Sequence, residues 1–149
     1  MLVRLLYASR AVEPIGNETV EAILAHSRAN NPEYGVTGVL CVCQDGNVFM
    51  QVLEGGRTEI NRLYGNIVRD ARHREVVLLD YAEIAERRFS GWRMGRVDLS
   101  KVNVGTVLKY SERPSLDPFA TSGTVALALL DELMSTAAIG GRSDSGRTS

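Results

Sequence analysis

The sequence predicts an α+β fold, in which two amphipathic helices lie on one face of a mixed β-sheet. Three features indicate this class: short apolar segments typical of strands, two helical stripes between them, and an Asp-Gly turn that joins two segments into a hairpin. The chain has 149 residues, 44% of them hydrophobic and 23% charged. That length and composition suit one globular domain.

The first half of the chain predicts a strand, a helix and a hairpin. Residues 2–9 are apolar apart from one arginine, as expected for a strand buried on most of both faces. Apolar positions at helical spacing then run from Asn17, a good N-cap, to about Asn30, where the following Asn-Pro pair is expected to break the helix. The hairpin has arms at 36–42 and 48–53.

The second half predicts a further helix and two more strands. Apolar residues recur at helical spacing from 58 to about 73, and a strand follows at 76–81. A short last strand covers 92–97, with Trp92 and Met94 on one face. The element order is therefore β-α-β-β-α-β-β, which is that of a ferredoxin-like fold with an added strand.

Two helices are expected after the sheet, at residues 101–111 and 124–134. The second is too apolar to face water alone, so these helices are expected to cover the open face of the sheet or to pack on another subunit. The predicted domains are a core at 1–97, a helical extension for assembly and output at 98–138, and a disordered tail at 139–149.

The composition argues against several classes of function. Lys and Arg total 17 against 18 Asp and Glu, so no basic excess is available to bind nucleic acid. The longest apolar run, at 125–130, is too short to span a membrane, and the N-terminus lacks a signal-peptide pattern. Cys41 and Cys43 are expected to be small hydrophobic residues in a reducing cytoplasm. The only histidines, His26 and His73, offer no metal-ligand spacing, so no metal site is expected.

Several polar side chains occupy positions whose periodicity points inward. Gln51 lies between two apolar residues of the third strand, Tyr7 projects from the apolar side of the first strand, and Ser27 and Asn31 continue the apolar stripe of the first helix. Two interpretations remain open. These groups line a pocket for a flat apolar ligand with a polar edge, such as a flavin ring, whose carbonyls and imide N–H an amide can match. Alternatively, they are core residues that bond to the backbone.

Motifs of common enzyme classes do not occur in the chain. G-x-S-x-G, G-x-G-x-x-G and G-x-x-x-x-G-K-[ST] are all missing, and no paired carboxylates are expected to face inward, so we do not expect an enzyme. The charged run at 69–73 could meet a phosphate, or it could be a solvated helix end whose cations interact favourably with the helix dipole.

Five segments, in order, resemble the BLUF family, whose members sense blue light using flavin. The resemblance covers residues 1–97 and implies a ferredoxin-like core with the isoalloxazine ring held between the two helices. The segments are Leu5-Leu6-Tyr7-Ala8-Ser9; Asn30-Asn31-Pro32 leading to Gly35-Val36-Thr37-Gly38-Val39-Leu40; Phe49-Met50-Gln51-Val52-Leu53-Glu54-Gly55; Arg69-Asp70-Ala71-Arg72-His73; and Arg87-Arg88-Phe89-Ser90-Gly91-Trp92-Arg93-Met94.

The resemblance also implies roles for particular residues. Tyr7 matches the tyrosine that donates an electron and a proton to the excited flavin. Gln51 matches the glutamine that bridges this phenol to the flavin and then changes its hydrogen bonds by rotation or tautomerisation. Asn31 matches the asparagine that holds the carbonyl and imide edge of the ring. Trp92 and Met94 match the pair on the last strand to which signal transmission is jointly assigned.

The remaining flavin contacts implied by the resemblance lie on the two helices and after the second one. Ser27 and Asn30 are expected near the ring, Ile67 is expected to pack on it, and Asp70 and Arg72 are expected along the ribityl side.

The resemblance implies FAD as the cofactor. FMN and riboflavin stay open, because Asn66 stands where some relatives carry a basic residue. The stretch after residue 97 is too short for an effector domain, so we expect a short, stand-alone photoreceptor in the cytoplasm. We also expect it to form a homo-oligomer and to signal to a separate partner protein.

Three alternatives to this function are retained. A flavin photoreceptor could instead form a cysteinyl adduct at Cys41 or Cys43, which would bleach the blue absorption band rather than shift it. A small hydrolase or flavin reductase, and a flavin- or metabolite-binding regulatory protein without photoactivity, could share the same fold.

Overall fold

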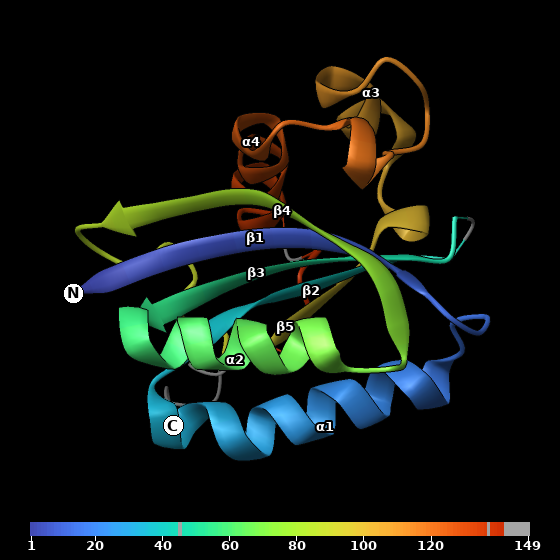
Figure 1. The fold of residues 1–149 in the computed structure, drawn as a ribbon. Coiled ribbons are helices and arrows are strands. Elements are labelled where there is room, and N and C mark those ends of the chain that lie inside the picture. Colours follow the sequence, from blue (N-terminus) through green and yellow to red (C-terminus); the bar gives the residue numbers. More distant parts are fainter. Residues whose placement is uncertain (45, 137, 142–149) are drawn as a thin grey trace, which may run out of the picture.

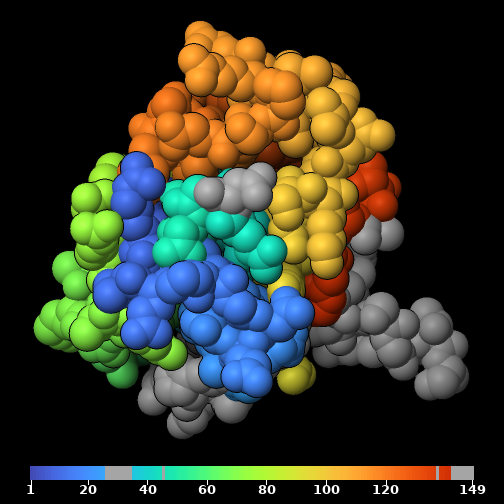
Figure 2. Space-filling model, turned by 90° about the vertical axis from the view of Figure 1, so that its right-hand side faces the viewer, coloured from blue at the N-terminus to red at the C-terminus, as the bar shows by residue number. Residues whose placement is uncertain are grey.

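A five-stranded sheet forms the middle of three layers (Figure 1). The computed structural model describes residues 1–44, 46–136 and 138–141, and their side chains except those of 26–34. Helices α1 (Asn17–Tyr34) and α2 (Arg57–Arg69) lie on one face of the sheet, and the C-terminal helices α3 (Val104–Tyr110) and α4 (Gly123–Met134) lie on the other. Figure 2 shows these layers from the side, with the C-terminal segment above the strands and the start of α1 below them.

The order of the sheet is β4-β1-β3-β2-β5. All neighbours are antiparallel except β2 and β5, which are parallel. This confirms the α+β class and the β-α-β-β-α-β-β order of a ferredoxin-like fold with an added strand. The elements are β1 (Leu2–Ala11), α1 (Asn17–Tyr34), β2 (Thr37–Cys43), β3 (Val48–Gly56), α2 (Arg57–Arg69), β4 (His73–Ile84), β5 (Gly95–Asp98), the 3₁₀ turn η1 (Leu99–Lys101), α3 (Val104–Tyr110), the 3₁₀ turn η2 (Pro118–Ala120) and α4 (Gly123–Met134).

Helix α1 is longer than the sequence predicts. The Asn-Pro pair was expected to break it near Asn30, but the helix continues through Pro32 to Tyr34. A proline close to a helix end removes one backbone donor and leaves the earlier turns intact. The helix stops before Gly35, whose φ of 68° is readily adopted only by glycine.

The strands β4 and β5 also differ from their expected bounds. Strand β4 starts at His73 rather than 76, because it pairs with nearly all of β1, from Ala11↔His73 to Leu2↔Ile84. Strand β5 starts only at Gly95, where its ladder with β2 begins. Trp92 and Met94 therefore precede the strand instead of forming part of it.

The expectation that Trp92 and Met94 share one face is wrong. Trp92 is buried in the cluster under the C-terminal helices, whereas Met94 is buried in the cluster between the sheet and α1 and α2. The alternation of side chains applies only within a regular strand, and these two residues lie in the turn before one.

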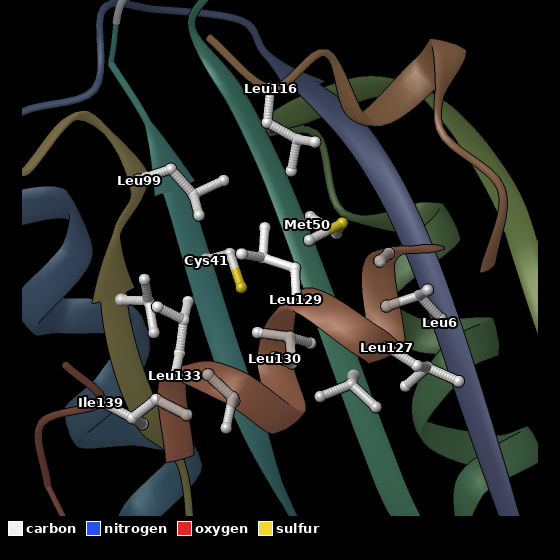
Figure 3. Packing of buried hydrophobic residues seen from close by; sticks show 14 of the residues in the cluster. Leu6, Cys41, Met50, Leu99, Leu116, Leu127, Leu129, Leu130, Leu133 and Ile139 are labelled. Atoms are coloured by element: carbon white, nitrogen blue, oxygen red, sulfur yellow. The ribbon is translucent and has the colours of Figure 1, made fainter. Parts of the chain in front are cut away.

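The C-terminal helices cover the open face of the sheet within the same chain. Side chains of α4 meet those of β1, β2 and β3 in one apolar cluster (Figure 3). Among its fully buried members are Leu6, Cys41, Met50, Leu129, Leu130 and Leu133. Of the two placements expected for these helices, the structure shows packing on the sheet.

Residues 139–141, the start of the expected tail, belong to the part of the chain that the structure describes. Ile139 is 5% exposed, and Gly140 forms an isolated antiparallel bridge with Arg96 on the outer edge of β5. The edge of β5 offers backbone groups for this pairing, and the disordered tail at 139–149 stays a prediction. The rest of the expected tail, 142–149, lies outside the described residues.

Candidate functional site

A cavity of about 170 Å³ lies between the sheet and the two helices α1 and α2. Its walls are mainly aliphatic and aromatic, with one amide and one phenol from the sheet and a charged pair at the end of α2. The lining residues are Tyr7, Ile23, Leu40, Phe49, Gln51, Leu63, Asn66, Ile67, Asp70, Arg72 and His73.

Tyr7 and Gln51 face each other across β1 and β3, where they are direct partners in the antiparallel register. Their side chains point to the same face of the sheet and are 4% and 5% exposed. The Tyr7 hydroxyl donates to Gln51 Oε1 at 2.6 Å. Gln51 Nε2 in turn contacts Met94 Sδ at 3.2 Å, donating to a weak acceptor. A hydrogen-bonded chain therefore runs from β1 through β3 to the segment before β5.

The surroundings of Tyr7 hold its phenol in the neutral form. Burial raises the pKa of Tyr7 well above its usual 10.0, and the nearby Tyr64 and Asp70 raise it further. The rings of Tyr64 and His73 lie 5.9 and 6.3 Å from the Tyr7 ring, centroid to centroid. Tyr7 is consequently a hydrogen-bond donor to Gln51.

His73 is a wall residue of the cavity. Its Nδ1 lies 2.8 Å from the hydroxyl of Ser9, a fully buried residue of β1. Its Nε2 contacts the carbonyl oxygen of Ile67, which can only accept, so Nε2 carries the proton in the neutral ring and Nδ1 accepts from Ser9. His73 thereby ties the end of α2 to β1.

A charged pair stands at the edge of the cavity, directly after α2. Arg72 donates to both oxygens of Asp70, with Nη2 at 2.6 Å and the backbone N at 2.9 Å. These hydrogen bonds lower the pKa of Asp70 to about 2 and raise the pKa of Arg72. Beside them, Arg69 donates to Asn66 at 2.6 Å.

The structure brings five of the expected site residues together around the cavity. These are Tyr7, Gln51, Ile67, Asp70 and Arg72. The expected side chains of Ser27, Asn30 and Asn31 lie outside the described part, although α1 carries their backbone.

The two expected signalling residues occupy different places. Met94 touches Gln51, and Trp92 is on the other side of the sheet.

Sequence reasoning missed several apolar wall residues. Ile23 and Leu63 belong to the helical stripes and Phe49 to the strand face, so they looked like ordinary core residues. The signal that could have found them is their position: each faces the same layer as Tyr7 and Gln51.

Neither cysteine belongs to this cavity. Cys41 and Cys43 lie in the cluster under α3 and α4, on the opposite face of the sheet. Burial raises the pKa of Cys41 to about 12, so its thiolate, the reactive form, is scarce at neutral pH. The geometry therefore speaks against a cysteinyl adduct.

The cavity suits a flat, mostly apolar ring with one polar edge. Ile23, Leu63 and Ile67 offer apolar surface to the faces of such a ring. Among the described contacts, Gln51 uses one amide proton and accepts from Tyr7, so its amide has a second proton and a second lone pair to offer. The isoalloxazine of a flavin has this shape and this pattern.

Solved structures with this architecture are known. BlsA in its photo-activated state aligns with a TM-score of 0.78 and 30% sequence identity, over 90% of this chain and 95% of that one. BlrB, a BLUF protein in its dark state, aligns with a TM-score of 0.73 and 29% identity, over 91% and 96% of the two chains. Fold and cavity thus define a flavin-type photosensory domain.

The family itself follows from the sequence. Residues 2–95 match the BLUF family, described as sensors of blue-light using FAD, and the chain belongs to this family. The blue light- and temperature-regulated antirepressor BluF of Escherichia coli (strain K12) is 35% identical over 103 residues, which are 66% of this chain and 24% of that protein.

Other relatives are much longer. Photoactivated adenylate cyclase subunit beta of Euglena longa is 33% identical over 88 residues, 59% of this chain and 10% of that protein. The chain thus matches a small part of the length of these curated relatives. Within the described residues, none of the helices is both long and apolar enough to cross a membrane.

Proposed function

We propose that this chain is a blue-light receptor that holds a flavin in the cavity between the sheet and the helices α1 and α2. The observation that carries the proposal is the hydrogen-bonded chain that starts from Tyr7 and Gln51 in the cavity wall and ends at Met94. A neutral phenol, an amide that both donates and accepts, and a soft sulfur acceptor form a contact that can be rearranged without moving the backbone.

When bound, a flavin would supply the blue-light absorption and act as the electron acceptor. Tyr7 would be the electron donor, and the 2.6 Å hydrogen bond from its buried phenol would direct its proton towards Gln51. Rotation or tautomerisation of Gln51 would reverse donor and acceptor at its amide. Once the electron and the proton are back on Tyr7, Gln51 would no longer make the same contact with Met94, and the segment before β5 would respond.

Residues at and after the end of α2 and at the end of α1 would hold the cofactor. Ile67 would pack on the ring, and Asp70 and Arg72 would lie along the ribityl side, since all three line the cavity. Family resemblance supports Asn31 on the imide edge, with Ser27 and Asn30 nearby. We propose FAD, with FMN or riboflavin as alternatives. Among similar structures, Klebsiella pneumoniae BlrP1, 29% identical with a TM-score of 0.67, is described with FMN.

The output would be passed on by contact rather than by catalysis. Residues 1–97 form the sensory unit, and 98–138 form the extension for output and assembly. The light state would reach a separate protein in the cytoplasm, through a homo-oligomer of this chain. The fit of α4 onto the open face of the sheet supports this, since it places the extension directly behind the photosensory core.

A pair of tyrosine variants tests the proposed switch. Tyr7→Phe removes the donor to Gln51 and should retain flavin but lose the light-induced shift in flavin absorption. Tyr64→Phe is the matched control, because this second tyrosine is near Tyr7 and has no described hydrogen bond to Gln51. It should keep the shift. A normal shift in Tyr7→Phe would remove Tyr7 from its proposed role.

A further inference from the structure

The segment 87–94, which lies between β4 and β5, is attached to strand β3 at both ends. At its far end Met94 contacts Gln51 on the cavity side of the sheet. At its near end the backbone binds the carboxylate of Glu54. Gln51 and Glu54 are three residues apart in β3, so their side chains point to opposite faces of the sheet.

Glu54 is a fully buried carboxylate that the function described above does not use. Its oxygens accept from Arg4 Nε at 2.8 Å, from the backbone N of Arg88 at 2.9 Å and from the backbone N of Phe89 at 2.7 Å. Burying a carboxylate is costly unless donors surround it, and here the donors come from β1 and from the segment. Glu54 therefore fixes the start of the segment to the middle of the sheet.

Backbone hydrogen bonds continue from this anchor toward Met94. The carbonyl of Phe89 accepts from the N of Trp92 at 3.1 Å, and the carbonyl of Trp92 accepts from the N of Gly38 at 3.0 Å. Gly38 packs directly against the backbone of β3, because a Cβ at this position would lie 2.0 Å from the carbonyl oxygen of Val52. The segment is thus tied to the sheet along its length, with little freedom to absorb a shift at Met94.

The anchored end also contacts the C-terminal layer. Arg88 Nη1 donates to Asp131 Oδ2 of α4 at 2.8 Å, and both side chains are about two-fifths exposed. An exposed ion pair of this kind adds little stability. Its importance is geometric, since the backbone of Arg88 is held by Glu54 while its side chain holds α4.

We propose that Glu54 is a positioning residue that makes segment 87–94 respond as one piece, so that a change at Gln51 reaches α4 through Arg88. This rests on the proposed function, because it assumes that Gln51 changes its hydrogen bonds in light. Glu54 touches neither the cavity nor the cofactor site. Its role is to hold the near end of the segment so that displacement of Met94 is passed along it.

The sequence supplies a specific reporter, because Trp92 is the only tryptophan. In the flavin-loaded full-length protein, blue light should change Trp92 fluorescence and the hydrogen exchange of amides in α4. Glu54→Gln keeps the size of the side chain but offers one acceptor oxygen and an N–H₂ donor to groups that all donate. This variant should keep the flavin absorption shift and lose both downstream responses.

Two surface variants separate the steps. Arg88→Ala removes the ion pair with Asp131 and keeps the backbone N–H that Glu54 binds, so it should keep the Trp92 response and lose the α4 response. Lys109→Ala is the matched control: it removes a different exposed ion pair to α4, Lys109 Nζ with Glu132 at 2.7 Å. It should keep every response. Arg88→Ala tests the link to α4 even if Glu54→Gln does not fold.

The outcomes distinguish this inference from the proposed function. An unaltered absorption spectrum in illuminated parent protein would contradict the proposed function itself. A normal absorption shift in Glu54→Gln with parent-like responses at Trp92 and α4 would overturn the role of Glu54. A parent-like α4 response in Arg88→Ala would overturn the link to the C-terminal layer. The same holds if light shifts the flavin absorption of the parent protein but leaves the hydrogen exchange of α4 unchanged.

Discussion

Burial of the Tyr7 phenol decides the direction of its hydrogen bond to Gln51. Because burial raises the pKa of Tyr7, the phenol keeps its proton and donates, and the amide oxygen of Gln51 accepts. The amide nitrogen is then directed to Met94. The orientation of one amide is thus set by the protonation of its neighbour, and a change in either would alter the whole chain of contacts.

This raised pKa has a measurable consequence in alkaline solution. The pKa of Tyr7 is higher in the folded state than its unfolded value of 10.0. Its contribution to stability is therefore fully present below pH 10 and is lost as the pH rises through the folded pKa. Tyr7 should therefore not ionise near pH 10 while the protein is folded. Spectroscopic titration should count the same number of tyrosines ionising near pH 10 in the parent and in Tyr7→Phe. One fewer in the variant would contradict the burial argument.

Single residues show what alternation in a sequence can and cannot predict. The shared face of Tyr7 and Gln51 was predictable, because both lie in regular strands. Alternation alone could not predict their hydrogen bond, since it depends on the register of β1 against β3; only the family resemblance implied it. The same alternation failed for Trp92 and Met94, because no ladder holds the chain at these two positions.

At the scale of elements, one asparagine connects the β2–β3 turn to the start of α1. Asn47 accepts from Ile15 N at 2.8 Å and donates to the carbonyls of Ala11 and Glu13 at 3.1 and 3.0 Å. Its own φ is 55°, a left-handed conformation that asparagine adopts more readily than most residues. Asn47 thus fixes the connection that leads into the helix beside the cavity.

Asn47→Ala should lower the free energy of unfolding by about 2–4 kcal/mol, since it removes the side-chain hydrogen bonds and strains the backbone. Asn47→Gly is the matched variant, because it loses the same bonds but tolerates the positive φ. It should recover about 1 kcal/mol of the loss. Urea unfolding of both variants measures this, and equal stabilities would show that the conformation of residue 47 is unimportant.

The sequence predicted which segments are helices and which are strands, whereas the residues at which they begin and end depend on the segments they pair or pack with. Strand β4 is longer than expected because it pairs with nearly all of β1. No local pattern in residues 73–75 predicted that they belong to the strand. Helix α1 continues through Pro32, although a proline usually ends a helix, because a helix tolerates the loss of one backbone hydrogen bond near its end. In both cases a tertiary or terminal context outweighed the local preference.

At the scale of the whole molecule, the sheet has two cores, and the C-terminal helices complete one of them. Leu129 of α4 is fully buried against β2 and β3 side chains such as Cys41 and Met50 (Figure 3). The apolar character of 124–134 predicted that it must be covered, but not by what. The structure answers this, because the same chain supplies the surface.

Leu129→Ala should therefore destabilise the protein by about 2–5 kcal/mol, through lost burial and the cavity left behind. Leu108→Ala is the matched control, since Leu108 of α3 is 47% exposed and should cost far less. Thermal unfolding of the two variants checks this. A similar loss of stability in both would mean that α4 contributes no more to the core than the exposed residues of α3.

The central claim is that blue light changes the hydrogen bonds of Gln51 around a chemically intact flavin. The most direct test is the visible absorption spectrum of the flavin-loaded protein in the dark, immediately after blue illumination, and during recovery. We expect a small red shift that returns fully in the dark and is lost in Tyr7→Phe. A bleached band, as a covalent adduct would give, or a spectrum that light leaves unchanged, would contradict the claim.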